Sequence, residues 1–286
     1  MKQVFICLIT FSIILSITES FSMTPDLSNL NLLYSKRVSI KYKSVGLSEP
    51  SGIVLTKERD ALLVVSDNKR CIFKIDLNGN LQTDATIEIE GTDLEGIALD
   101  DQGILYAVSE EKNAIIAISD GLAIKARKIK DMKGYSNIAK FFAESVNKGL
   151  EGITSYKDSL LLLKEGPPGI LIEISNNLGE IISHRILDEK SGFTDDDIKG
   201  KKIDYSGICL YSVSDQIFWI VSDKAKRIFL YDWEKDKVIK SFPLAYTKNG
   251  KAREIKKAEG ITYNPDNKHL YIVSDEEARL YVFELR

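Results

Sequence analysis

Histidine and cysteine are scarce in this sequence, which has two histidines and three cysteines among its 286 residues. Three cysteines are too few for a disulfide scaffold. The two histidines, His184 and His269, leave little room for a zinc site or for histidine-based catalysis. An excess of charge of either sign is also missing, because 39 basic and 42 acidic residues give a net charge of −3. Without surplus cations to neutralise phosphates, the composition argues against a nucleic-acid partner.

Long apolar runs are missing as well, apart from one near the N-terminus. Residues 4–17 carry no charge, follow Lys2 and precede the small residues Ser20 and Ser22, which is the pattern of a secretory signal peptide. The run is shorter than the roughly 20 residues of a spanning helix, although an uncleaved anchor stays an alternative. We therefore predict a signal peptide or N-terminal anchor over residues 1–22, a linker over 23–36 and one domain over 37–286.

This leading segment also predicts a location. We expect the domain outside the cytoplasm, in the periplasm, in the cell envelope or secreted. Contact with a membrane is expected only through the N-terminal segment, and the domain itself is expected to be a monomer.

A short motif recurs five times along the chain: a serine or glutamate, then glycine, then isoleucine. Its glycines are separated by 44, 56, 55 and 53 residues. Each copy is followed by an apolar segment that ends in an acid, and then by another apolar segment. These segments have the composition and length of β-strands. Repeats of roughly 40–55 residues built from four strands are typical of a β-propeller, so the sequence predicts an all-β fold with five blades.

The last repeat lacks a fourth strand, because the chain ends at Arg286, directly after the third. The segment Arg37–Ser44 alternates apolar residues, such as Val38 and Ile40, with polar ones. We expect this segment to pair with the strand Arg279–Leu285 and to complete the last blade. Such pairing closes the ring and covers a strand edge that would otherwise promote aggregation.

The repeat also gathers acidic residues on one face of the predicted propeller, because the first strand of a blade begins where the second ends. Carboxylates crowded on one rim raise one another's pKa unless a cation joins them. Calcium suits such a rim, since it accepts six to eight oxygen ligands in loose geometry. We therefore predict a calcium site among eight residues. They are Glu95, Glu151 and Glu259 at the first strands, and Asp67, Glu110, Glu165, Asp223 and Asp275 at the ends of the second strands.

A purely structural role is the alternative for these acids. The glycine can permit close backbone approach at the start of a blade, and the acids at the strand ends can cap turns. Ser51 and Ser206 replace the glutamate in two copies of the motif, so the turn itself does not require an acid. The three inner glutamates are therefore stronger ligand candidates than the five outer acids.

The ordered motif resembles the SdiA-regulated family of bacterial extracytoplasmic proteins, which are distantly similar to NHL-repeat proteins. The resemblance covers about residues 37–286 and depends on the order Ser, Glu, Glu, Ser, Glu before the five glycines. It implies a five-bladed propeller, an N-terminal membrane-directed segment and a bound calcium ion, but no reaction. The matching segments are Pro50-Ser51-Gly52-Ile53, Asp93-Leu94-Glu95-Gly96-Ile97, Gly149-Leu150-Glu151-Gly152-Ile153, Asp204-Tyr205-Ser206-Gly207-Ile208, Lys257-Ala258-Glu259-Gly260-Ile261 and Leu270–Asp275.

Three functions are compatible with these features. The first is a calcium-binding propeller that acts as a binding module of the bacterial envelope, for a peptide, a saccharide or another envelope protein. The second is a metal-dependent hydrolase or lactonase of the NHL- or paraoxonase-like type, in which the ion would polarise an ester carbonyl. This second reading rests on analogy between folds. The third is a structural envelope protein whose acidic rim is only a solvated surface.

Overall fold

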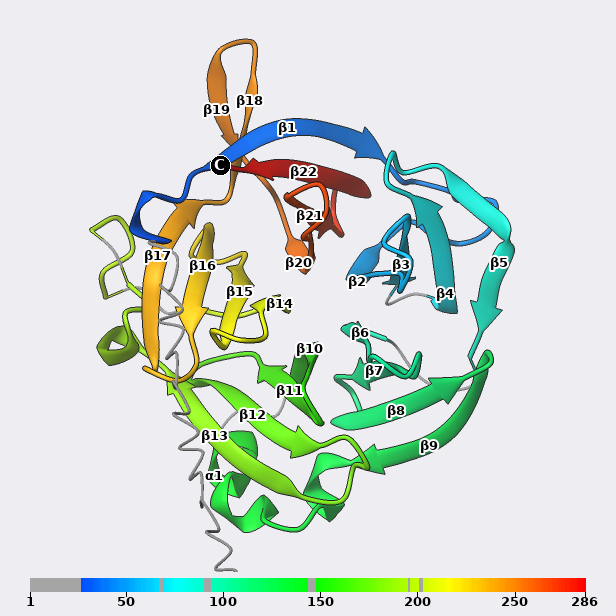
Figure 1. Ribbon diagram of the computed structural model, residues 1–286, viewed down its shortest axis with the longest axis vertical. Helices are drawn as coiled ribbons and strands as arrows, with labels where there is room; N and C mark the ends of the chain where they lie inside the picture. The colour runs from blue at the N-terminus through cyan, green and yellow to red at the C-terminus, as the bar shows by residue number, and fades with distance from the viewer. Residues whose placement is uncertain (1–26, 67–68, 90–93, 144–147, 195, 201–202) are drawn as a thin grey trace, which may run out of the picture.

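The computed structural model describes residues 27–66, 69–89, 94–143, 148–194, 196–200 and 203–286. The predicted signal peptide or anchor over residues 1–22 and the predicted ligand Asp67 lie outside these ranges. Five four-stranded antiparallel sheets surround a central axis, as Figure 1 shows. The chain is an all-β, five-bladed β-propeller, which confirms the predicted fold class.

In the first four blades, the strands follow chain order from the axis outward. Blade one contains β2 (Pro50–Leu55), β3 (Ala61–Ser66), β4 (Lys69–Asp76) and β5 (Leu81–Glu88). Blade two contains β6 (Ile97–Leu99), β7 (Leu105–Ser109), β8 (Ala114–Ser119) and β9 (Leu122–Lys128). Blade three contains β10 (Leu150–Tyr156), β11 (Ser159–Lys164), β12 (Gly169–Ser175) and β13 (Ile181–Leu187). Blade four contains β14 (Gly207–Ser212), β15 (Ile217–Ser222), β16 (Arg227–Asp232) and β17 (Lys237–Pro243).

The fifth blade combines the two ends of the described chain. Its inner strands are β20 (Ala258–Asn264), β21 (His269–Ser274) and β22 (Arg279–Leu285), and its outermost strand is β1 (Leu32–Ser39). β1 pairs antiparallel with β22, with Leu32 opposite Leu285 and Ser39 opposite Arg279.

The predicted bounds of this fourth strand were wrong. β1 begins inside the range 23–36 that was expected to be a linker, and only residues 37–39 of the predicted segment belong to it. The register follows from packing, because the Tyr34 ring lies 6.1 Å from the Phe283 ring and 5.8 Å from the Tyr246 ring. After β1, the side chain of Ile40 is fully buried, and its backbone N–H donates to the carbonyl of Ala278.

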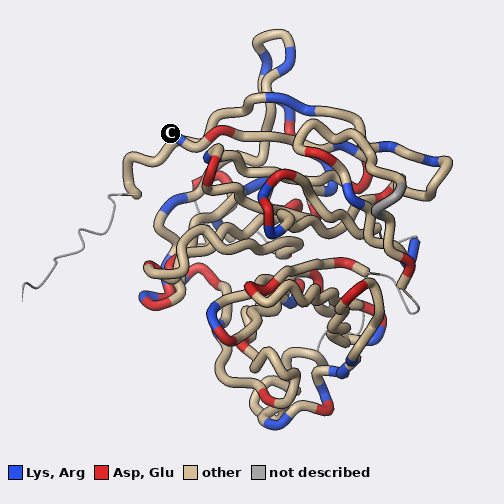
Figure 2. Tube along the Cα trace, turned by 45° about the vertical axis from the view of Figure 1, so that its right-hand side comes forward, with Lys and Arg blue, Asp and Glu red and all other residues tan. Residues whose placement is uncertain are grey.

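The remaining elements are short and lie between or outside the blades. A hairpin of β18 (Ala245–Lys248) and β19 (Lys251–Glu254) projects from the ring and carries basic residues on both strands (Figures 1 and 2). Among the described residues, no helix is both long and apolar enough to span a membrane. The helical segments are η1 (Leu27–Asn29), η2 (Ile129–Asp131), η3 (Tyr135–Asn137), α1 (Ala139–Ala143) and η4 (Glu189–Ser191).

The hydrophobic core is divided into five clusters, each between two neighbouring blades. The middle strands supply most of it, since apolar residues cover both of their faces; β11, for example, is buried at every position. Trp219 contributes to the cluster between blades four and five, and Phe218, on the opposite face of the same strand, to the cluster between blades three and four. The cluster between blades five and one contains both Tyr271 and Phe73. Because burial of one large apolar side chain stabilises by roughly 1.5–3 kcal/mol, the contacts between blades hold the ring together.

The motif glycines lie at the axis, where the innermost strands of neighbouring blades approach most closely. A Cβ added to Gly207 would lie only 2.4 Å from the carbonyl oxygen of Glu259 in the next blade, a separation that side chains do not show. Gly152 is slightly less crowded, with the Cγ2 of Ile208 at 3.1 Å. The corresponding distances are 2.3 Å from Gly52 to the Glu95 oxygen, 2.5 Å from Gly96 to the Glu151 oxygen and 2.7 Å from Gly260 to the Ser51 oxygen.

We expect Gly207→Ala to destabilise the propeller strongly, because the new methyl group meets backbone that cannot move without separating two blades. A loss of about 3 kcal/mol in the free energy of unfolding is expected, which lowers the Tm by roughly 6–12 °C. Gly250→Ala, at the tip of the projecting hairpin, is the control. No atom lies within 4 Å of its added Cβ, and only its positive φ of 72° opposes alanine. Thermal unfolding of both variants tests the expectation, which is wrong if Gly207→Ala is as stable as the control.

Candidate functional site

Acidic residues from several blades surround a cavity of about 330 Å³ at one end of the central channel. Seven of the eight predicted ligands line this acidic cavity, and the eighth, Asp67, lies outside the described residues. The strand arrangement explains the gathering, because the first strands begin and the second strands end at this end of the propeller. The seven are Glu95, Glu110, Glu151, Glu165, Asp223, Glu259 and Asp275.

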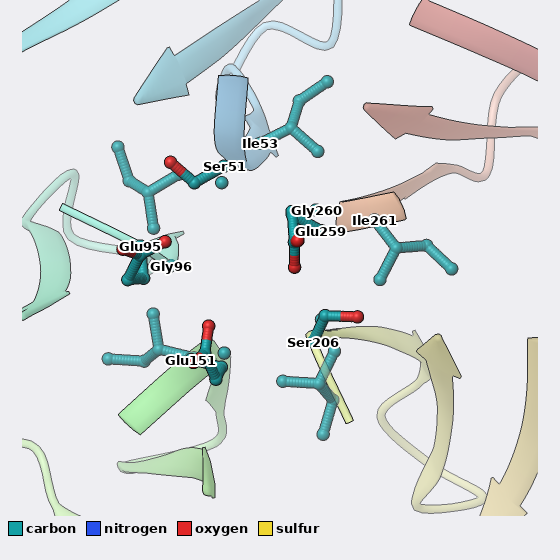
Figure 3. A pocket seen from close by; sticks show the side chains of 15 residues that line it. Ser51, Ile53, Glu95, Gly96, Glu151, Ser206, Glu259, Gly260 and Ile261 are labelled. Atoms are coloured by element: carbon teal, nitrogen blue, oxygen red, sulfur yellow. The ribbon is translucent and has the colours of Figure 1, made fainter. Parts of the chain in front are cut away.

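The innermost ring of this cavity consists of the residues that precede the motif glycines. Figure 3 shows Glu95, Glu151 and Glu259 around the axis, with Ser51 and Ser206 completing the ring. The two serines have an evident structural role. Ser51 Oγ donates to the carbonyl of Leu94 at 3.1 Å, and Ser206 Oγ donates to the carbonyl of Ala258 at 2.8 Å, each in the next blade.

The glutamates differ from the serines because an ionised carboxylate has no proton to donate to a neighbouring carbonyl. At these three positions the side chain therefore cannot replace the serine bond between blades while it is charged. The glycine satisfies the packing requirement of the motif, and the acid needs another explanation.

The acids at the ends of the second strands have structural partners. Glu110 accepts a hydrogen bond from the backbone N–H of Gly149 at 3.0 Å, and Asp223 accepts one from that of Ala258 at 3.2 Å. Each bond joins one blade to the start of the next, so the structural alternative holds in part for these outer acids. Three of them also form ion pairs: Glu165 with Lys148 at 2.5 Å, Asp223 with Lys226, and Asp275 with Lys257 at 2.6 Å.

One group of acids converges closely enough to share a cation. Carboxylate oxygens of Glu110, Glu151 and Glu165 lie within 4.8 Å of one another. Two oxygens bound to one calcium ion at about 2.3–2.6 Å can be at most about 5 Å apart, so this spacing fits calcium. All three donors are hard oxygen ligands, and two of them come from blade three and one from blade two. The geometry therefore favours a position beside the axis over one shared symmetrically by all five blades.

The electrostatics of the ring are unfavourable for charged glutamates. Burial, followed by repulsion from Glu95, Glu110, Glu259 and Glu165, raises the pKa of Glu151 well above its ordinary value. Burial and the repulsion of Glu95 and neighbouring aspartates raise the pKa of Glu259 to about 8, although Lys257 opposes the increase. Glu259 therefore holds a proton near neutral pH when no cation is bound, and burial and crowding favour the protonated form of Glu151.

Two further charged residues of the cavity were missed by the sequence analysis. Asp204 and Lys257 line it. The Asp204 carboxylate accepts hydrogen bonds from Ser222 Oγ at 3.2 Å and from the Lys224 backbone N–H at 2.9 Å, so it fixes the turn after β15. The sequence contained a signal for Asp204, because Asp93 and Asp204 stand at the same position of the repeated motif.

Neither histidine lies beside the acids. His184 is in the outermost strand of blade three, where its ring lies 5.7 Å from that of Phe141. His269 begins β21, and its ring lies 6.1 Å from that of Tyr271. The described lining of the acidic cavity includes neither residue.

The arrangement defines a class of protein, a five-bladed β-propeller with an acidic cavity at one end of its channel. Within this class, the model of the SdiA-regulated family matches the sequence over residues 14–119 and 110–284. The chain belongs to the SdiA-regulated family. No curated protein has a significantly similar sequence.

Solved structures show the same fold in proteins of very different sequence. Glutaminyl cyclase of Myxococcus xanthus superposes with a TM-score of 0.61 at 10% identity, over 89% of this chain and 96% of that one. The β-propeller domain of Cps50 (Swd1) from Myceliophteria thermophila superposes with a TM-score of 0.51 at 9% identity, over 89% and 99%. At these identities the likeness concerns the fold alone.

The raised pKa of Glu259 predicts a pH-dependent stability. Between the ordinary pKa of 4.5 and the folded value of about 8, the folded state keeps a proton that the unfolded state has lost. The contribution of this group to stability therefore falls as the pH rises through that range. In the presence of a chelator, Glu259→Gln should raise the Tm by several degrees at pH 8 and have little effect at pH 4.5.

Thermal unfolding at the two pH values measures this difference. Glu58→Gln, at an exposed turn, is the matched control and should change the Tm equally little at both. Equal effects of Glu259→Gln at pH 4.5 and pH 8 would contradict the raised pKa.

Proposed function

We propose that this protein is a calcium-binding β-propeller that acts as a binding module outside the cytoplasm. The observation that carries the proposal is the convergence of Glu110, Glu151 and Glu165 inside a cavity lined by further acids. Uncompensated carboxylates repel one another and retain protons, whereas a divalent cation relieves both costs at once.

The donor set favours calcium over other divalent ions. Three carboxylates can supply up to six oxygens, within the six to eight that calcium accepts, and their flexible side chains suit its loose geometry. Magnesium demands near-ideal octahedral geometry, and zinc prefers nitrogen and sulfur ligands. To bind through both oxygens, Glu165 would have to release Lys148, whose Nζ lies 2.5 Å from its Oε1.

The cavity also suits a role in recognition. When bound, calcium would supply a positive charge and free coordination positions at the mouth of the channel. The carboxylate of a peptide, the hydroxyls of a saccharide or an acidic loop of another envelope protein could complete the coordination. A location in the periplasm, in the cell envelope or outside the cell would give a weak site access to millimolar calcium. We propose that the domain works there as a monomer.

Calcium titration by calorimetry tests the proposal. Saturable binding is expected, with an affinity that rises with pH because the ion must displace a proton from Glu151, whose pKa is raised. Titrations in buffers of different ionisation enthalpy should detect the released protons. Glu151→Gln should weaken calcium binding at least tenfold while the protein stays folded, and Glu58→Gln should leave it unchanged.

The proposal fails if the wild-type protein binds no calcium, or if Glu151→Gln binds it as tightly as the wild type. Equal affinity for magnesium would show a solvated acidic surface without a built site. Circular dichroism of each variant confirms that any loss of binding occurs in folded protein.

A metal-dependent hydrolase or lactonase is the second candidate, and one observation favours it. A carboxyl group with a pKa of about 8, such as Glu259, is suited to proton transfer near neutral pH. If a panel of esters and lactones reveals an activity, Glu259→Gln should lower kcat at least a hundredfold. The double change His184→Asn and His269→Asn should leave it nearly intact. A hundredfold loss in the histidine variant, without unfolding, would place the reaction outside the acidic cavity.

A further inference from the structure

A second cavity, of about 670 Å³, occupies the opposite end of the channel. We call it the aliphatic cavity, because its floor is the ring of five motif isoleucines and its lower wall includes leucines from β2, β6 and β14. Its volume is within the range of pockets that bind small molecules. The floor isoleucines are Ile53, Ile97, Ile153, Ile208 and Ile261, each only 2–4% exposed.

The two cavities are separate chemical compartments. The neck between them, at the ring of motif residues, has a volume of about 10 Å³, which is close to the minimum for one water molecule. A ligand cannot pass from one cavity to the other. The aliphatic cavity therefore needs an explanation independent of the calcium site.

One wall of the aliphatic cavity carries a pair of tyrosines with available hydroxyls. The rings of Tyr211 and Tyr263 lie 5.2 Å apart. Neither hydroxyl forms a hydrogen bond with any described residue. Burial raises the pKa of Tyr263 to about 12, so its hydroxyl stays protonated and can donate. Tyrosines of this kind combine a large apolar surface with one polar group.

Two lysines that line the aliphatic cavity, Lys57 and Lys157, form no ion pair with a described carboxylate. Lys57 Nζ donates to the backbone carbonyl of Asp101 at 3.1 Å, which is a neutral acceptor. Lys157 Nζ lies over the ring of Tyr156, 4.8 Å from its centroid. Neither lysine forms an ion pair with a described residue, whereas the third rim cation, Arg59, is paired with Asp266 at 2.6 Å.

Two acids also line this cavity, and they oppose the lysines only in part. The carboxylate of Asp100 is occupied by its own turn, since it accepts from the backbone N–H groups of Gln102 and Ile104 and from the Tyr106 hydroxyl. Asp101 is the one acid of the described lining whose carboxylate has no such bonds, and its side chain is exposed. An anion therefore meets far less repulsion here than at the acidic cavity.

We propose that the aliphatic cavity binds a small amphipathic carboxylate. Its hydrocarbon tail packs against the isoleucine floor, and its carboxylate lies at the rim between Lys57 and Lys157. Burial of each further CH₂ group should tighten binding about fourfold, which makes affinity depend on the length of the tail. Tyr211 and Tyr263, from blades four and five, add apolar surface and hydroxyl donors to the cavity wall.

Calorimetric titration with sodium octanoate tests this proposal, because octanoate has one saturated tail and one carboxylate. Octanoate is expected to bind with one site per chain, and to do so equally in calcium and in a chelator. Acetate, which lacks the tail, should show no binding. 1-Octanol, which lacks the charge, should bind at least fivefold more weakly than octanoate.

Charge variants separate the rim from the rest of the surface. The double change Lys57→Glu and Lys157→Glu should weaken octanoate binding at least tenfold. The double change Lys128→Glu and Lys199→Glu alters the net charge equally at exposed lysines outside the cavity and should have no effect. Val213, which lines the cavity and is 48% exposed, can be replaced by a residue of either charge. Val213→Lys should tighten binding, and Val213→Glu should weaken it.

The proposal is overturned if octanoate shows no saturable binding, or if 1-octanol binds as tightly as octanoate. It is also overturned if both Val213 variants bind like the wild type, a comparison that does not depend on the double variant being folded. Because calcium removal tests the acidic cavity alone, failure of this proposal and failure of the calcium site give different results.

Discussion

Close contact between backbones at the axis is the constraint on which the rest of this structure depends. Five innermost strands converge on a channel whose neck is barely wide enough for one water molecule. Only glycine allows the backbone of Gly207 to approach the carbonyl of Glu259, and the same holds at Gly52, Gly96 and Gly260, whereas Gly152 faces the side chain of Ile208. The glycine thus sets the distance between blades, and the five hydrophobic clusters form at that distance.

The same contact explains the unusual electrostatics of the acidic cavity. Four of the five motif glycines pack against the carbonyl of the residue that precedes the next glycine, so side chains at these positions are crowded around the axis. Serine resolves the crowding by donating a hydrogen bond to the next blade, as Ser206 does to Ala258. An ionised glutamate cannot donate such a hydrogen bond. Its pKa rises instead, as at Glu151 and Glu259. The crowding that holds the blades together therefore also creates the site at which a cation would stabilise the protein.

The channel has two ends with opposite chemistry, and the motif produces both. In each copy the residue before the glycine points to the acidic cavity, and the isoleucine after it forms the floor of the aliphatic cavity. The three-residue motif is thus at the boundary between a polar compartment and an apolar one. A propeller built in this way can hold two ligands of different chemistry without exchange between them.

Much of this organisation was determined by the sequence itself. The spacing of the glycines predicted five blades. The positions of the acids at the strand ends predicted that they share one face, because strand direction follows from chain order in an antiparallel blade. Seven of these acids line one cavity. Sequence patterns could not locate β1, since its register depends on aromatic contacts of Tyr34 with Phe283 and Tyr246 across more than 200 residues.

Tertiary structure alone decided which acids converge. The eight predicted ligands occupy two positions of the repeat, but among the described residues only Glu110, Glu151 and Glu165 bring carboxylate oxygens within 4.8 Å of one another. Ion pairs with lysines occur both inside and outside this group, since Glu165 pairs with Lys148 while Asp223 and Asp275 pair with Lys226 and Lys257. The repeat fixes where a side chain begins, whereas its hydrogen-bond and ion-pair partners fix where its charge lies, and those partners differ from blade to blade.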